Sequence, residues 1–264
     1  MAKTKIFIAV PSTGNIADSL WFRLRDLEAA YGKEIEFVYP KQLVQRKFHD
    51  AARNGMVEDF LASDADIMWF IDSDVVPPPN VLDLVTKYGQ HWELAGAPYP
   101  VFITHAASST AQIVLCVYHR DEIGMHAMKV PHEGTAFVSG LATGCIFIKR
   151  EIFSKLKKPY FEFKYNPETR GMTEGEDLGF CMKVNDLGYE FFTDFSMVCS
   201  HYKTVNLLDV NNYAIDYAQN SLNNVAGEMK EQIYDAVKAA YREGFEKGSK
   251  KASGRTESGI ILPK

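Results

Sequence analysis

Short apolar runs and helix-like repeats of apolar residues alternate along the first two thirds of the chain. Five apolar runs bounded by turn residues predict buried strands, at residues 5–10, 35–39, 67–71, 94–97 and 145–148. Between them, apolar positions at helical spacing predict helices over residues 18–31, 48–61 and 173–186. This order predicts an α/β fold with a mixed, mainly parallel central sheet flanked by helices.

The last quarter of the chain has a different pattern. Apolar residues keep helical spacing across residues 206–247, for example at Leu222, Val225 and Met229. We therefore expect a catalytic domain over residues 1–205 and a C-terminal helical extension, which could pack on that domain or on a second subunit of a homo-oligomer. Residues 248–264 are rich in Gly, Ser and Lys, a composition typical of a disordered tail.

Composition narrows the class of protein only a little. The 264 residues are 46% hydrophobic and 24% charged, as in ordinary globular proteins, and the net charge of −5 gives no general attraction for nucleic acid. No apolar stretch reaches the ~20 residues that cross a bilayer. The four cysteines are far apart in apolar surroundings, which indicates reduced core residues. These features predict a cytoplasmic protein without an integral membrane segment.

Two carboxylates, Asp72 and Asp74, follow directly after the apolar run Ile67–Ile71. On an extended chain, residues i and i+2 point to the same side, and two such charges repel unless a cation or donors lie between them. Oxygen ligands favour Mg²⁺ or Mn²⁺, which usually also take substrate phosphates. The alternative is a solvated acidic turn at a strand end.

Three further places could contact a ligand. Pro11 and Ser12 follow the first strand, where βα loops of open sheets hold ligands. Gly144 precedes another strand and permits either close approach of a ligand or simply a tight turn. Arg53, in the predicted helix 48–61, is either a solvated surface residue or a residue near the nucleotide.

An acidic pair, Glu176 and Asp177, begins the predicted helix 173–186. Thr173 and Glu176 match the capping box of a helix N-terminus, which would give Glu176 a structural role. Asp177 has no such role, and a carboxylate at that position could take a proton from an acceptor hydroxyl.

The ordered set of motifs resembles glycosyltransferases of the GT-A fold, in the family-2-like branch that includes bacterial and bacteriophage versions. The set comprises Ala52-Arg53-Asn54, Asp72-Ser73-Asp74, Thr143–Arg150, Gly175–Phe180 and Ser200-His201. The resemblance implies a nucleoside-diphosphate sugar donor, such as a UDP-sugar, and a Mn²⁺ or Mg²⁺ ion. It implies metal ligation by Asp72, Asp74 and His201, and donor contacts by Pro11, Ser12, Arg53, Asp72, Ser73 and Gly144. It also implies Asp177 as the base and Glu176 as its acceptor-binding neighbour.

Other functions remain open at this point. A sugar-phosphate nucleotidyltransferase would share the sheet and the metal carboxylates, but would need a glycine- and basic-rich loop after the first strand. A non-catalytic module that binds nucleotide sugars or glycans would bind a donor without turnover. The acceptor could be a glycan or, for a viral enzyme, a hydroxymethylated DNA base.

Overall fold

A computed structural model describes residues 2–12, 16–40, 48–105, 110–128 and 133–204, together with residues 211, 214, 215 and 238. The chain divides into two units, Met1–Ile103 with Ile113–Thr204, and Thr104–Gln112 with Val205–Lys264. The predicted helical extension, the homo-oligomer contact proposed for it and the predicted tail therefore lie almost wholly outside the described residues.

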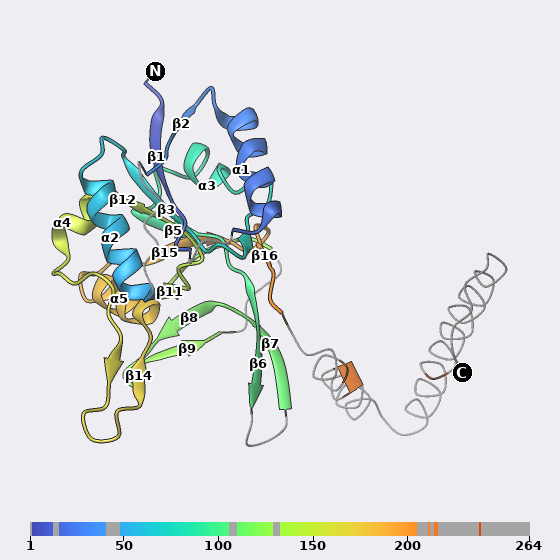
Figure 1. Cartoon of the computed structure of the whole chain (residues 1–264), viewed down its shortest axis with the longest axis vertical. Helices are drawn as coiled ribbons and strands as arrows, with labels where there is room; N and C mark the ends of the chain where they lie inside the picture. The colour runs from blue at the N-terminus through green and yellow to red at the C-terminus, as the bar shows by residue number, and fades with distance from the viewer. Residues whose placement is uncertain are drawn as a thin grey trace, which may run out of the picture. The chain divides into compact units, whose positions relative to one another are not determined.

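The main sheet has seven strands in the order β10-β15-β5-β12-β3-β1-β2 (Figure 1). Their bounds are β1 Thr4–Ala9, β2 Ile35–Val38, β3 Ile67–Ile71, β5 Leu94–Gly96, β10 Thr135–Val138, β12 Cys145–Lys149 and β15 Phe191–Asp194. Short strands form smaller two- and three-stranded sheets, namely β4 Val75–Val76, β6 Pro100–His105, β7 Thr110–Leu115, β8 Val117–Arg120, β9 Met125–Ala127, β11 Gly140–Leu141, β13 Lys164–Tyr165, β14 Met172–Glu174 and β16 Ser200–His201.

The mixed sheet is confirmed, and its parallel character is only partial. The pairs β1–β2, β1–β3 and β5–β15 are parallel. The pairs β3–β12, β5–β12 and β10–β15 are antiparallel. β12 lies between β3 and β5 and runs against both. All its residues from Cys145 to Ile148 are buried, so its apolar run reads the same in either direction.

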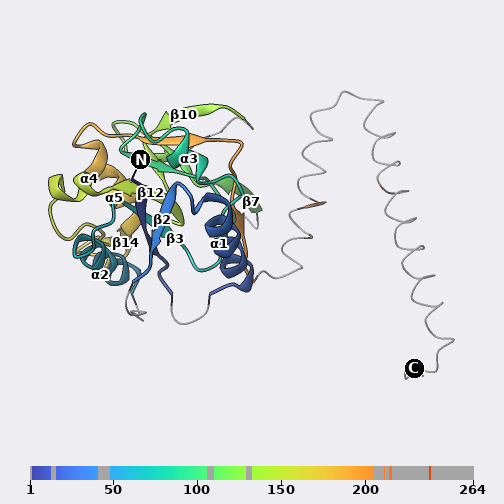
Figure 2. The same cartoon turned by 90° about the horizontal axis from the view of Figure 1, so that it is seen from above.

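Five helices accompany the sheet in the described part of the chain, namely α1 Asp18–Tyr31, α2 His49–Leu61, α3 Asp83–Thr86, α4 Arg150–Lys155 and α5 Glu176–Asn185. Figures 1 and 2 show α1 and α3 on one face of the sheet and α2, α4 and α5 on the other. The helices predicted over residues 18–31 and 48–61 are confirmed to within one residue.

A hydrophobic core lies on each face of the sheet, because alternate residues of a strand point to opposite sides. In β3, Trp69 and Ile71 pack in the core under α1, and Met68 and Phe70 pack in the core under α2 and α5. A strand buried on both faces and flanked by neighbours on both edges is held rigidly. The polar residues that follow β3 are therefore presented from a fixed support.

Candidate active site

The residues Asp72 to Asp74 form a tight turn between β3 and β4. The carbonyl of Asp72 accepts a hydrogen bond from Val75 N–H at 3.0 Å, and Asp72 N–H donates to the Gly144 carbonyl at 3.0 Å. The expectation that both carboxylates share one side of an extended chain is therefore wrong. The turn directs Asp72 toward Arg53 of α2. It directs Asp74 toward His201 of β16 and the nearby Lys203.

Asp72 accepts a hydrogen bond from Arg53 Nη2 at 3.0 Å. Arg53 is only 3% exposed, so the surface alternative for this residue is wrong. Its Nε donates to Glu176 Oε1 at 3.4 Å, and its guanidinium lies 5.5 Å from the centre of the Phe70 ring. Burial opposes the charge of Arg53, but Asp72 and Glu176 outweigh that effect and raise its pKa.

Arg53 has one nitrogen, Nη1, that is buried without a hydrogen-bond partner. A buried unpaired donor costs free energy, and such groups are few in native proteins. The hydroxyl of Thr143, next to Gly144, is also buried and unpaired. The unpaired nitrogen of Arg53, on the guanidinium that holds Asp72, is an atom for which a polar ligand atom could supply the missing partner.

Asp74 meets His201 because β4 and β16 pair, with Val75 opposite His201 and Tyr202 N–H bonded to the Asp74 carbonyl. His201 Nε2 lies 3.6 Å from Asp74 Oδ2. His201 Nδ1 lies 2.8 Å from the Pro100 carbonyl, which can only accept, so Nδ1 carries the proton. In the neutral ring Nε2 then carries the lone pair, which is the form in which a histidine binds a metal.

These donors fit a hard divalent cation. Among the described residues, no three His, Cys, Asp or Glu side chains are gathered closely enough to hold a metal ion by themselves. Mg²⁺ and Mn²⁺ commonly take only one or two carboxylates from the protein and fill the other positions with water and substrate phosphates. Asp74 and His201 meet that requirement. Asp72, two residues before Asp74, is held by Arg53.

The capping box predicted for Thr173 and Glu176 is wrong. Thr173 lies in β14, and Gly175 is the N-cap of α5 without a side-chain hydrogen bond. Glu176 is instead the first residue of the helix and is 7% exposed, where Arg53 holds it. The exposed His49 approaches the same oxygen at 3.8 Å.

Asp177 is half-buried, and its Oδ1 accepts from Leu178 N–H at 2.8 Å. Its charge contributes, after burial, to the raised pKa values of Tyr99 and Tyr118, and of Cys116, whose pKa rises to about 11. The charge of Asp177 therefore acts on Tyr99, which Asp72 also affects, and on Tyr118 of β8. The structure brings both acidic residues of α5 to the carboxyl edge of β3.

Tyr99 is a site residue that the sequence did not indicate. Its ring lies edge-on to His201, with centroids 4.9 Å apart, and burial together with the nearby Asp72 raises its pKa. A Cβ on Gly144 would come within 2.6 Å of this ring. Gly144 thus permits close packing of Tyr99, which favours the structural alternative for that glycine.

The donor contacts implied for the remaining residues are not tested by the geometry. Pro11 and Ser12 follow β1 and are partly buried, and the next residues, 13–15, lie outside the described part. The Ser73 carbonyl accepts from Ala17 N–H at 2.9 Å, which ties the turn to the start of α1. These residues stay predictions.

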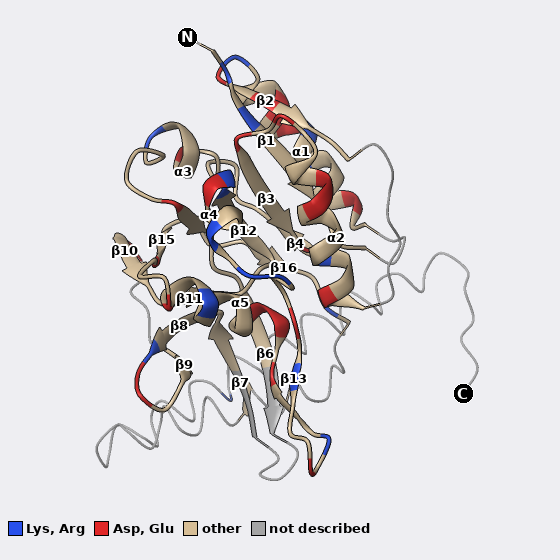
Figure 3. Ribbon diagram, turned by 90° about the vertical axis from the view of Figure 1, so that its left-hand side faces the viewer, with Lys and Arg blue, Asp and Glu red and all other residues tan. Residues whose placement is uncertain are grey.

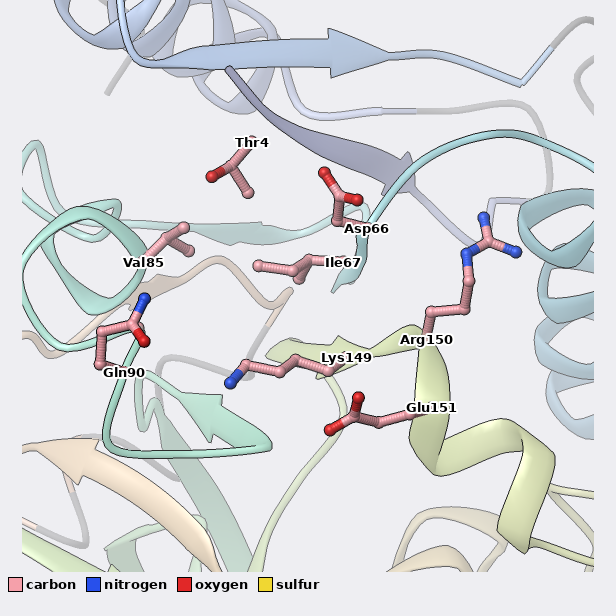
Figure 4. Close-up of a pocket in the computed structure, with 9 residues that line it drawn as sticks. Thr4, Asp66, Ile67, Val85, Gln90, Lys149, Arg150 and Glu151 are labelled. Atoms are coloured by element: carbon pink, nitrogen blue, oxygen red, sulfur yellow. The ribbon is translucent and has the colours of Figure 1, made fainter. Parts of the chain in front are cut away.

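A pocket lies at the opposite edge of the sheet, at the start of β1 and β3 and the end of β12 (Figure 4). Thr4, Asp66 and Lys149 are among its lining residues. Two of its charged groups have structural duties: Asp66 accepts from Lys5 N–H at 2.8 Å, and Arg150 donates to Ala65 O at 2.7 Å and to three other carbonyls near the end of α2. We place the candidate site at the Asp72 edge instead.

The amino-acid sequence matches no protein-family model and no curated protein. Solved structures show a low likeness. A197 from STIV is 22% identical, with 76% of this chain and 86% of that one covered and a TM-score of 0.48. The catalytic domain of Drosophila β1,4-galactosyltransferase 7, in complex with xylobiose, is 16% identical over 76% and 71%, with a TM-score of 0.42. GalNAc-T7 with UDP, GalNAc and Mn²⁺ is 11% identical over 77% of this chain and 44% of its own, with a TM-score of 0.40.

Among the described residues, no helix is both long and apolar enough to pass through a lipid bilayer.

Basic and acidic residues are interspersed along the described ribbon, and acidic residues gather at the start of α5 (Figure 3). Of the two acidic residues that begin α5, Glu176 is buried against Arg53 and Asp177 is half-buried.

Proposed function

We propose that the chain is a metal-dependent glycosyltransferase of the GT-A type, which transfers a sugar from a nucleoside diphosphate, such as UDP, to an acceptor hydroxyl. The observation that carries this proposal is the Asp72–Arg53–Glu176 chain of ion pairs. It joins the turn after β3 to the start of α5. One site thus holds a candidate metal position and a candidate base, from residues more than a hundred positions apart.

Asp74 and His201 would hold the cation, with Asp72 beside them. A divalent ion bound there would offset the negative charge that develops on the leaving diphosphate. Arg53 would hold Asp72 and Glu176 in place through its two ion pairs, and its unpaired Nη1 offers a further hydrogen-bond donor to the nucleotide sugar.

Asp177 would receive the proton of the acceptor hydroxyl if the reaction inverts the anomeric centre. One of its oxygens is held by Leu178 N–H, which fixes the carboxylate and leaves the other oxygen for the acceptor. If the configuration is retained, Asp177 has no need to act as base. Glu176, whose carboxylate is held by Arg53, serves mainly to position α5.

Two measurements test this function. The first is a thermal-shift screen of nucleotide sugars with and without Mn²⁺, in which a donor should raise the melting temperature only when the ion is present. The second is turnover of any donor that binds, with glycans and hydroxymethylated DNA as acceptors. Binding without hydrolysis or transfer would favour the non-catalytic module, and release of pyrophosphate from a nucleoside triphosphate and a sugar phosphate would favour the nucleotidyltransferase.

A further inference from the structure

Lys203 and His201 both approach the same carboxylate oxygen of Asp74. The ammonium of Lys203 forms an ion pair with Asp74 Oδ2, and His201 Nε2 lies 3.6 Å from the same oxygen. Asp74 Oδ2 thus faces both a histidine nitrogen and a lysine cation. A metal ion bound by Asp74 and His201 would use this oxygen.

The backbone places Lys203 there. Ser200 and His201 pair with Val76 and Val75 in the β4–β16 ladder, and Tyr202 N–H then donates to the Asp74 carbonyl at 2.9 Å. Because the ladder fixes the register, the residue after Tyr202 emerges beside the Asp74 side chain. Lys203 is 55% exposed and Asp74 is 33% exposed, so the ammonium can leave the carboxylate for water.

We propose that Lys203 is an internal cation that competes with the divalent metal for Asp74. When the metal binds, the Lys203 ammonium must give up Asp74 Oδ2, so part of the metal-binding free energy is spent on breaking this pair. The affinity of the site is therefore set below the value that Asp74 and His201 would give alone. This inference rests on the proposed metal position.

The size of the effect follows from the exposure of the pair. Ion pairs this exposed contribute little, and their loss changes a competing equilibrium by roughly twofold to fivefold. Removing the ammonium should therefore tighten metal binding by that factor. The effect should shrink as salt is raised, because salt screens the competing pair as well.

The test is Mn²⁺ binding by the whole chain, without nucleotide sugar, measured by isothermal titration at low and high salt. Lys203→Gln should bind Mn²⁺ roughly twofold to fivefold more tightly than the wild type at low salt. Lys87→Gln is the matched control: Lys87 is 66% exposed and pairs with Asp83 at 2.7 Å, outside the site. It should leave Mn²⁺ affinity unchanged. Adding Asp74→Asn to Lys203→Gln should abolish the gain.

Equal or weaker Mn²⁺ binding by Lys203→Gln would overturn the proposal, and so would failure of both proteins to bind Mn²⁺. Binding by Lys203→Gln alone would support it in its strongest form. The proposed function fails separately. If Lys203→Gln tightens Mn²⁺ binding but no nucleotide sugar is bound or turned over, Lys203 competes for a metal site of another activity.

Discussion

Arg53 Nε lies 3.4 Å from Glu176 Oε1, across 123 positions of the chain, and both side chains are buried. The same guanidinium holds Asp72 at 3.0 Å. Helix α2, the turn after β3 and helix α5 are thus joined by one cation. Arg53 thus adds a buried ionic link to the core packing of Phe180 and Val184, which also holds α5 on the sheet.

Arg53→Met should lower the free energy of unfolding by about 3–5 kcal/mol, because it leaves Glu176 and part of Asp72 buried without the opposite charge. Urea denaturation followed by circular dichroism measures this. Arg25→Met on the exposed side of α1 is the control and should stay within about 0.5 kcal/mol of the wild type. A loss of the same small size for Arg53→Met would mean that the pair is not formed in solution.

Glu176→Gln and Asp177→Asn should separate a positioning residue from a base. Glu176→Gln removes the buried charge opposite Arg53 and should cost about 1–3 kcal/mol of stability. Asp177 is half-buried, so Asp177→Asn should change stability little. For an inverting enzyme the same substitution should lower kcat by about 10²–10⁴. Near-normal turnover in Asp177→Asn, with a large loss in Glu176→Gln, would reverse the two roles.

Gly144→Ala should disturb the site through Tyr99. The new Cβ would lie within 2.6 Å of the Tyr99 ring, whose edge contacts His201. We expect a loss of about 1–3 kcal/mol in stability from overpacking. Gly171→Ala is the control, because a Cβ there meets only the Thr169 hydroxyl at 3.4 Å. Equal melting temperatures for the two variants would contradict the close packing of Gly144.

Stability should fall between pH 9 and pH 11. Burial raises the pKa of the Cys116 thiol from 9.0 to about 11. Below pH 9 the thiol is protonated in both states and its contribution to stability is complete. Between the two pKa values the unfolded chain loses this proton and the folded chain keeps it, so stability declines by about 1.4 kcal/mol per pH unit. Cys116→Ala should show a shallower decline, and an identical pH profile would contradict this assignment.

The sequence was sufficient to predict the layered α/β fold and the bounds of α1 and α2, because apolar spacing is set by local geometry. The direction of β12 could not be predicted, because a wholly apolar run is typical of parallel strands and β12 has this pattern although it runs antiparallel to both neighbours. The burial of Arg53 could have been predicted. It continues the buried stripe of Met56, Val57 and Phe60, from which it is separated by three, four and seven positions.

The site was harder to predict than the fold because its contacts are long-range. The acid and histidine motifs indicated Asp74, His201 and Glu176, and the structure brings each beside another predicted site residue. Nothing local marks Tyr99 or Lys203, which reach the site only through the pairing of β16 with β4 and the packing against Gly144. The capping box at Thr173 failed because β14 pairs with β13 and takes Thr173 out of the helix start.

Metal-dependent turnover of a nucleotide sugar is the central claim, and one measurement tests it most directly. The rate of sugar release or transfer from each member of a UDP-sugar panel is measured with Mn²⁺, after excess EDTA, and again after Mn²⁺ is restored, for the wild type and for Asp74→Asn. We predict turnover of at least one donor by the wild type, its loss with EDTA, its recovery with Mn²⁺, and a greatly reduced rate for Asp74→Asn. Full activity in excess EDTA, or normal Mn²⁺-dependent activity of Asp74→Asn, would contradict the account.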